Sequence, residues 1–89
     1  MGYSAIGYIK YPMSGGTESQ KEKLRSILRK MRKEANLRQL DLANKLSKPQ
    51  SFVSKYESGE KTLDFFEVKE ICDVLNISLS DFIKKIEGM

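Results

Sequence analysis

Histidine and tryptophan are absent from this 89-residue chain, and it has only one cysteine. Without histidine the chain lacks the commonest general base and a frequent metal ligand. A single cysteine forms no disulfide within the chain and no cysteine–histidine cluster with the spacing of a zinc site. No glycine-rich phosphate loop precedes an expected helix. The sequence therefore predicts a protein that is not an enzyme and that holds no metal or cofactor.

Long apolar runs are also missing. No stretch approaches the roughly 20 apolar residues of a membrane-spanning helix, and the N-terminus lacks the basic-then-apolar order of a secretory signal. Hydrophobic residues make up 39% of the chain and charged residues 31%, which is typical of a globular protein. We expect one cytoplasmic domain without membrane contact and without an evident small-molecule ligand.

The charge is unevenly distributed. Residues 21–38 carry eight basic side chains against two acids, whereas residues 62–89 carry six acids against three lysines. Such a dipole can orient a protein on a polyanion, although a basic run also fits an ordinary solvated helix face.

Residues 1–20 differ in character from the remainder. They contain three of the four tyrosines and end in the linker-like sequence MSGGTESQ. The alternation in YSAIGYIKY allows a short strand that pairs with a symmetry mate, but a flexible arm or linker fits equally well. The domain boundary is therefore expected between this arm, residues 1–20, and a helical domain, residues 21–89.

Five short helices are predicted after the arm, which makes the fold class all-α. The first starts at residue 22, follows an apolar stripe that includes Ala35, and stops at Asn36. The second covers residues 39–46, and the third runs from Pro49 to about residue 57. Capping motifs begin the last two helices, whose stripes are Val68, Ile71, Cys72, Leu75 and then Leu79, Phe82, Ile83, Ile86.

The third helix has two distinct faces. On a wheel of about 100° per residue, Phe52, Val53 and Tyr56 fall on one side. The opposite side carries short hydrogen-bonding groups and one cation, which are Gln50, Ser51, Ser54 and Lys55. These side-chain types can read base edges in the major groove, although they also fit an ordinary polar surface.

The segment LRQLDLANKLSKPQSFVSKYESGEKTLD resembles the helix-turn-helix of phage-repressor-like proteins of the Cro/xenobiotic-response-element (XRE) type. The matching residues are Leu37, Gln39, Leu42, Ala43, Leu46, Gln50, Val53, Ser54, Tyr56, Glu57 and Gly59. The resemblance extends over about residues 24–86 and implies a five-helix, lambda-repressor-like DNA-binding domain.

The resemblance also implies roles for individual residues. Base contacts are expected from Gln50, Ser51, Ser54 and Lys55. Phosphate contacts are expected from Gln39, Arg38, Lys48, Ser58 and Lys61, with Gln39 also bracing Gln50. Arg32 and Glu57 are expected to form a partly buried structural ion pair.

Several positions depart from the family pattern. Arg38 replaces the usual Ser or Thr cap of the second helix, so we expect that cap to be lost. Ser47 stands in place of the turn glycine, and Phe52 is larger than the usual Ser or Thr.

The function predicted from these features is sequence-specific binding of double-stranded DNA. We expect the protein to be a transcription regulator, favour a repressor over an activator, and expect it to act as a homodimer. A helical protein-interaction module with Phe65, Phe66 or Val74 exposed is the alternative. Antitoxin-like and restriction-controller autoregulators also fit the sequence.

Overall fold

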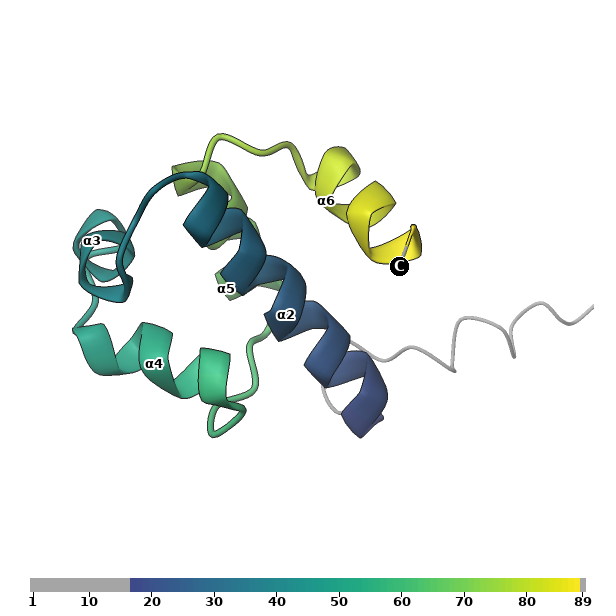
Figure 1. Ribbon diagram of the computed structural model, residues 1–89, viewed down its shortest axis with the longest axis horizontal. Helices are drawn as coiled ribbons and strands as arrows, with labels where there is room; N and C mark the ends of the chain where they lie inside the picture. The colour runs from purple at the N-terminus through teal and green to yellow at the C-terminus, as the bar shows by residue number, and fades with distance from the viewer. Residues whose placement is uncertain (1–16, 89) are drawn as a thin grey trace, which may run out of the picture.

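The computed structural model describes residues 17–88 and has five α-helices in that part of the chain (Figure 1). Their bounds are α2 Glu18–Glu34, α3 Gln39–Lys45, α4 Gln50–Ser58, α5 Phe65–Val74 and α6 Leu79–Glu87. The all-α prediction is confirmed, and the expected number and order of helices are found. The strand considered for residues 3–11 lies outside the described residues.

The first helix begins earlier than expected. Thr17 is its N-cap: its hydroxyl accepts the backbone N–H of Gln20 at 3.0 Å, and the Gln20 side-chain oxygen accepts the Thr17 N–H at 2.9 Å. This reciprocal pair satisfies two backbone donors that a helix start otherwise leaves unpaired. Residues 17–20, expected in the arm, therefore form the cap and first turn of α2.

Left-handed residues end or separate the helices as the sequence indicates. Asn36 and Asn76 have φ values of 60° and 61°, and Gly59 closes α4 with φ 92°. Ser47, in the turn between α3 and α4, also has a positive φ, 56°. A side chain with a Cβ atom is strained in this region, so Ser47 occupies a conformation that a glycine would adopt more readily.

The core lies between α2 and the other four helices, which are arranged around α2 in Figure 1. Its fully enclosed side chains come from α2 to α6 and include Leu28, Leu42, Val53, Tyr56, Ile71, Cys72 and Phe82. Two expected core residues are exposed instead. Ala35 is exposed at the end of α2, where the helix has already stopped, and Ile83 is 44% exposed because α6 turns mainly Phe82 inward.

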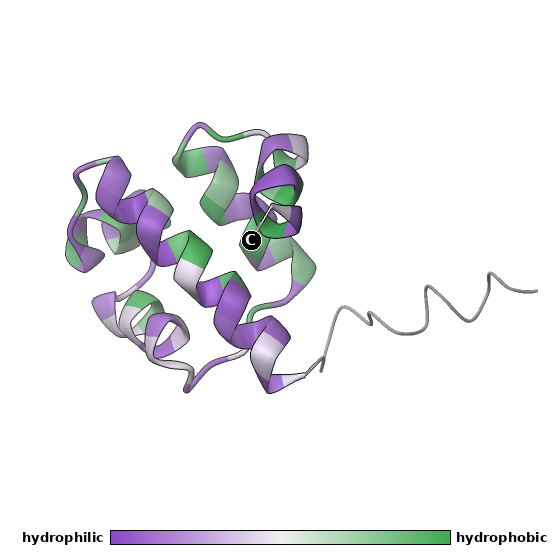
Figure 2. Ribbon diagram, turned by 45° about the vertical axis from the view of Figure 1, so that its right-hand side comes forward, coloured by the Kyte–Doolittle hydropathy of each residue, from purple (hydrophilic) through white to green (hydrophobic). Residues whose placement is uncertain are grey.

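Both C-terminal helices are capped by the residues expected from the sequence. The Asp64 carboxylate accepts the Glu67 N–H at 2.8 Å, and the Ser78 hydroxyl accepts the Asp81 N–H at 3.1 Å. In contrast to these helices, α2 is largely hydrophilic along its length (Figure 2). Each helix within residues 17–88 is too short or too polar to span a bilayer.

Candidate nucleic-acid interface

The turn between α3 and α4 sets the direction of α4. Leu46 ends α3, Ser47 reverses the chain, and the Lys48 N–H donates to the Ala43 carbonyl at 2.9 Å. Pro49 then serves as the N-cap of α4 in an extended conformation. The small side chain of Ala43 is completely buried, so α3 and α4 pack closely across this turn.

The two faces of α4 are oriented as the wheel predicts. Val53 and Tyr56 are buried, whereas Gln50, Ser51 and Lys55 are exposed along the outer side of the helix. The outer face, formed by Gln50, Ser51 and Lys55, thus presents an amide, a hydroxyl and an ammonium group to solvent. This set can bond the acceptor and donor atoms of base edges.

Ser54 lies partly outside this face. Its side chain is half-buried, and its hydroxyl donates to the Ser51 carbonyl at 3.3 Å. The hydroxyl proton is therefore directed back along the helix. In this state Ser54 has only acceptor capacity left for a base.

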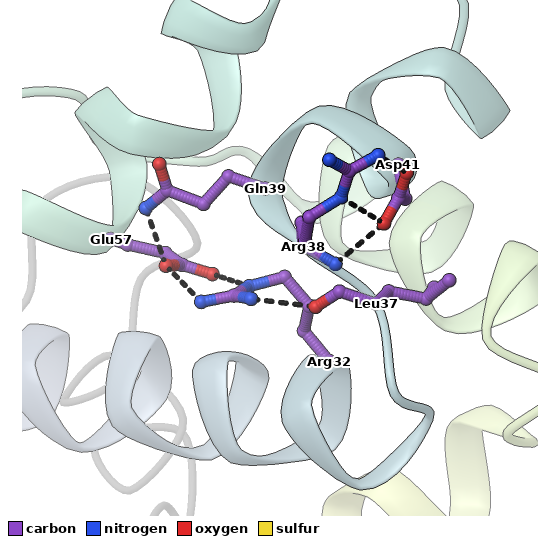
Figure 3. Close-up of polar contacts among 6 residues, drawn as sticks. All are labelled: Arg32, Leu37, Arg38, Gln39, Asp41 and Glu57. Atoms are coloured by element: carbon purple, nitrogen blue, oxygen red, sulfur yellow. Dashed lines mark hydrogen bonds and ion pairs between the residues drawn. The ribbon is translucent and has the colours of Figure 1, made fainter.

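A buried ion pair fixes the end of α4 to α2 (Figure 3). The Arg32 Nε donates to Glu57 Oε2 at 2.7 Å, and its Nη2 donates to Glu57 Oε1 at 3.0 Å. The Arg32 Nη1 also donates to the Leu37 carbonyl at 2.7 Å. The bidentate hydrogen bond that Arg32 donates to Glu57 raises the pKa of Arg32. The side chains are only 8% and 4% exposed, so this is the structural pair expected from the resemblance.

Gln39 joins the same network. Its Nε2 donates to Glu57 Oε1 at 2.9 Å, so the amide is directed at the carboxylate (Figure 3). The expected bracing of Gln50 is not what Gln39 does in this structure. Glu57 is thereby contacted from both α2 and α3, and it ties three helices together.

Arg38 has a partner within the protein that was not expected from the sequence. The Arg38 Nε and Nη2 donate to the two carboxylate oxygens of Asp41 at 3.0 and 2.9 Å (Figure 3). The Asp41 carboxylate also accepts the Arg38 backbone N–H at 2.9 Å. These hydrogen bonds from Arg38 lower the pKa of Asp41 to about 2. One backbone donor at the start of α3 is thus satisfied by Asp41, although the side chain at the cap position is no longer Ser or Thr.

Phe52 is enclosed by aromatic and cationic groups. Its ring meets that of Tyr56 edge to face at 5.7 Å between centroids. The ammonium groups of Lys48 and Lys61 lie 5.4 and 5.5 Å from the Phe52 centroid. The ring therefore acts as a half-buried platform that holds two of the expected phosphate-binding lysines on the same side of α4.

Lys61 and Ser58, at the end of α4, already have partners within the protein. The Lys61 ammonium pairs with Glu67 at 3.3 Å. The Ser58 hydroxyl lies 3.1 Å from the Lys55 carbonyl oxygen and 3.2 Å from a Glu60 carboxylate oxygen. It can donate its proton to either of these two acceptors. A hydrogen bond from Ser58 to phosphate would replace these internal bonds, whereas the Lys61 ammonium has three donors and can keep its pair with Glu67.

The thiol of Cys72 is a buried core group and not an exposed nucleophile. It is buried in the core, and burial raises the pKa of its thiol to about 11, so the thiol is protonated at neutral pH. Within residues 17–88, no three Cys, Asp or Glu side chains gather in a way that could hold a metal ion.

Two polar contacts were not expected from the sequence. The Gln39–Glu57 bond joins residues 18 positions apart, and no local pattern indicates it. The Arg38–Asp41 pair could have been predicted from the sequence. An acidic side chain three residues after the N-cap often accepts the backbone N–H of the N-cap residue.

Comparison with known proteins agrees with this geometry. The helix-turn-helix family model matches residues 28–82. An XRE-family-like protein from Pseudomonas syringae pv. tomato str. DC3000 is 30% identical, with 98% of each chain covered and a TM-score of 0.75. No protein of curated function matches the sequence.

Two crystal structures of the clp gene regulator ClgR from Corynebacterium glutamicum share the fold. One is 23% identical over 78% of this chain and 88% of that chain, and the other is 22% identical over 86% and 78%; both have a TM-score of 0.69. The family match and the XRE-family relative thus agree with the α3–turn–α4 geometry. The chain belongs to the Cro/C1-type, XRE-family helix-turn-helix proteins, which are DNA-binding transcription regulators.

Proposed function

We propose that this protein is a sequence-specific transcription regulator that inserts α4 into the major groove of double-stranded DNA. The observation that carries the proposal is the outer face of α4, where Gln50, Ser51 and Lys55 are exposed while the opposite side is anchored in the core. Gln can bond adenine through two hydrogen bonds, Lys can donate to the guanine acceptors, and Ser can contact several bases. Ser54 contributes as an acceptor at the edge of this face.

Phosphate contacts are proposed on both sides of the groove. Lys48 and Lys61 both lie over the Phe52 ring, and Arg38 and Gln39 lie at the start of α3. Ser58 and the backbone around Gly59 would complete the contacts at the end of α4. Because these contacts are made to phosphate, they position the protein without selecting a base sequence.

The proposed assembly is a homodimer on a palindromic site. Helix-turn-helix proteins that read half-sites place their two recognition helices about 34–36 Å apart, one turn of the duplex. The proposed direction of regulation is repression, since a protein seated in the groove at a promoter excludes others from the same DNA. The similarity to the clp gene regulator ClgR supports a role in gene regulation.

A protein-interaction module is the second candidate. Phe66 favours it, because this ring is 76% exposed at the start of α5 and stacks edge to face on Phe65 at 5.5 Å between centroids. An exposed aromatic ring is suited to a protein partner. If the protein is an interaction module, the outer face of α4 is an ordinary polar surface with no role in DNA binding.

Selection from a random pool of duplex DNA tests the two candidates. The wild type and the Gln50→Ala/Lys55→Ala variant are run side by side, with Phe66→Ser as a control that alters the aromatic pair alone. A palindromic consensus that is lost in the double variant and retained in Phe66→Ser supports the DNA-binding proposal. No enrichment by a folded wild type would reject it and favour the interaction module.

A further inference from the structure

Three cations meet beside the end of α4, on the side that faces α2. Lys21 and Arg25 come from the N-terminal half of α2, and Lys61 comes from the segment after α4. Together with Gly59 they line a pocket of about 80 Å³, in which Glu18 supplies the one carboxylate among the lining residues. The charge of this pocket is therefore positive, with three cations against one acid.

Arg25 lies directly against the backbone at Gly59. A Cβ atom built on Gly59 would be only 3.1 Å from the Arg25 Cζ. The absence of a side chain at Gly59 therefore allows the guanidinium to approach the end of α4, in addition to permitting the left-handed φ of 92°. This places the Arg25 charge next to the last turn of the proposed recognition helix, and Figure 1 shows that turn beside the first half of α2.

Two of the three cations have no partner among residues 17–88. Within residues 17–88, the ammonium of Lys21 and the guanidinium of Arg25 make no hydrogen bond and no ion pair, although both side chains are half-buried. Lys61 does pair with Glu67, at 3.3 Å. Partly buried cations without a counter-charge carry a desolvation cost that an anion would offset.

We infer that Lys21, Arg25 and Lys61 bind a backbone phosphate of the DNA duplex. The pocket is far smaller than the roughly 300 Å³ or more of a site that encloses a small-molecule ligand, so it suits one phosphate group at the surface. It lies at the end of α4, where Gly59 and Lys61 follow the helix that carries Lys55. Lys21 and Arg25 precede residues 28–82, the segment matched by the family model, so they extend the interface beyond the helix-turn-helix.

This inference rests on the proposed function, and the salt dependence of DNA binding tests it. Full-length wild type, Lys21→Ala and Arg25→Ala are titrated onto one labelled duplex of random sequence between about 50 and 200 mM salt. Lys30→Ala is the matched control, because Lys30 is an exposed cation of α2 that faces α6 rather than α4. Arg25→Lys keeps the charge, and circular dichroism verifies that each variant is folded.

Because the three cations share one phosphate, loss of this contact is expected to reduce the slope of log K against log salt by at most about 0.9. Between about 50 and 200 mM salt, the affinity of Arg25→Ala and of Lys21→Ala should therefore fall by a factor up to about 3.5 smaller than that of the wild type. Lys30→Ala should keep the wild-type slope, and Arg25→Lys should restore it. Equal slopes for all variants of a DNA-binding wild type would overturn the inference and leave the proposed function standing. A folded wild type that binds no duplex would overturn both.

Discussion

Arg32 and Glu57 form a bidentate ion pair across 25 residues of sequence, with both side chains almost completely buried. The pair connects the last turn of α2 to the last turn of α4. Gln39 adds a third hydrogen bond to the same carboxylate from the start of α3. The orientation of the helix-turn-helix relative to α2 therefore depends on Glu57.

Substitution of Glu57 by Gln should destabilise the fold strongly. The change leaves the Arg32 guanidinium buried without a counter-charge, which typically costs about 3 kcal/mol or slightly more. Urea unfolding of Glu57→Gln and wild type measures the difference. Arg38→Ala, which breaks an exposed ion pair, is the control and should cost less than about 1 kcal/mol. An equal loss of unfolding free energy in the two variants would show that the buried Arg32–Glu57 pair matters no more for stability than the exposed Arg38–Asp41 pair.

Lys55→Ala should relax base preference at one position of the site. Lys55 is exposed on the outer face of α4, where its ammonium can donate to guanine. The expected loss is about 1–3 kcal/mol on the preferred sequence and much less on a duplex altered at that one base pair. Binding isotherms on both duplexes measure it. The same loss on the two duplexes would assign Lys55 to a phosphate instead.

The helices could be predicted from the sequence because each has a local signal. Apolar spacing, the Asp64 and Ser78 caps and the stops at Asn36 and Asn76 are all short-range features, and the structure confirms them. The start of α2 also had a local signal in the Thr17–Gln20 pair, which lies within a stretch whose composition resembles a linker.

Most of the site's geometry depends on tertiary packing and could not be derived from spacing. The Gln39–Glu57 bond and the approach of Arg25 to Gly59 require the crossing of α2 with α4 to be known. The outer face of α4 was predictable, since a helical wheel needs only the helix itself. The Arg32–Glu57 pair was expected from the family resemblance, because no local rule joins residues so far apart.

Arg38→Ala should weaken binding to all duplexes similarly. If Arg38 contacts a phosphate, its removal reduces the salt slope by about one unit. The Arg38 guanidinium is held by Asp41, so Asp41→Asn should free it and strengthen binding to every sequence. Anisotropy titrations at several salt concentrations measure both effects. An unchanged slope for Arg38→Ala would remove Arg38 from the interface.

Ser47→Gly should stabilise the protein. Ser47 has a φ of 56°, and a left-handed residue with a Cβ atom costs about 1–2 kcal/mol. Glycine relieves that strain but loses about 0.5–1 kcal/mol through its greater freedom in the unfolded chain. A net gain of about 0.5 kcal/mol is therefore expected in urea unfolding. Ser51→Gly, within α4, should destabilise instead, and a destabilised Ser47→Gly would show that the serine side chain stabilises the turn.

The Arg38–Asp41 pair should make stability depend on pH in the acidic range. The pKa of Asp41 is lowered from 3.8 to about 2 in the folded state by hydrogen bonds from Arg38. A carboxylate whose pKa is depressed by folding stabilises the fold above its unfolded pKa, and this contribution is lost as pH falls from about 4 to about 2. Asp41→Asn has no such titration but can still accept the Arg38 N–H. The difference in urea midpoint between wild type and Asp41→Asn should therefore shrink across this window, because the other carboxylates titrate in both proteins. A difference that stays constant down to pH 2 would mean that the Asp41 carboxylate is no more stable as an anion in the folded protein than in the unfolded chain.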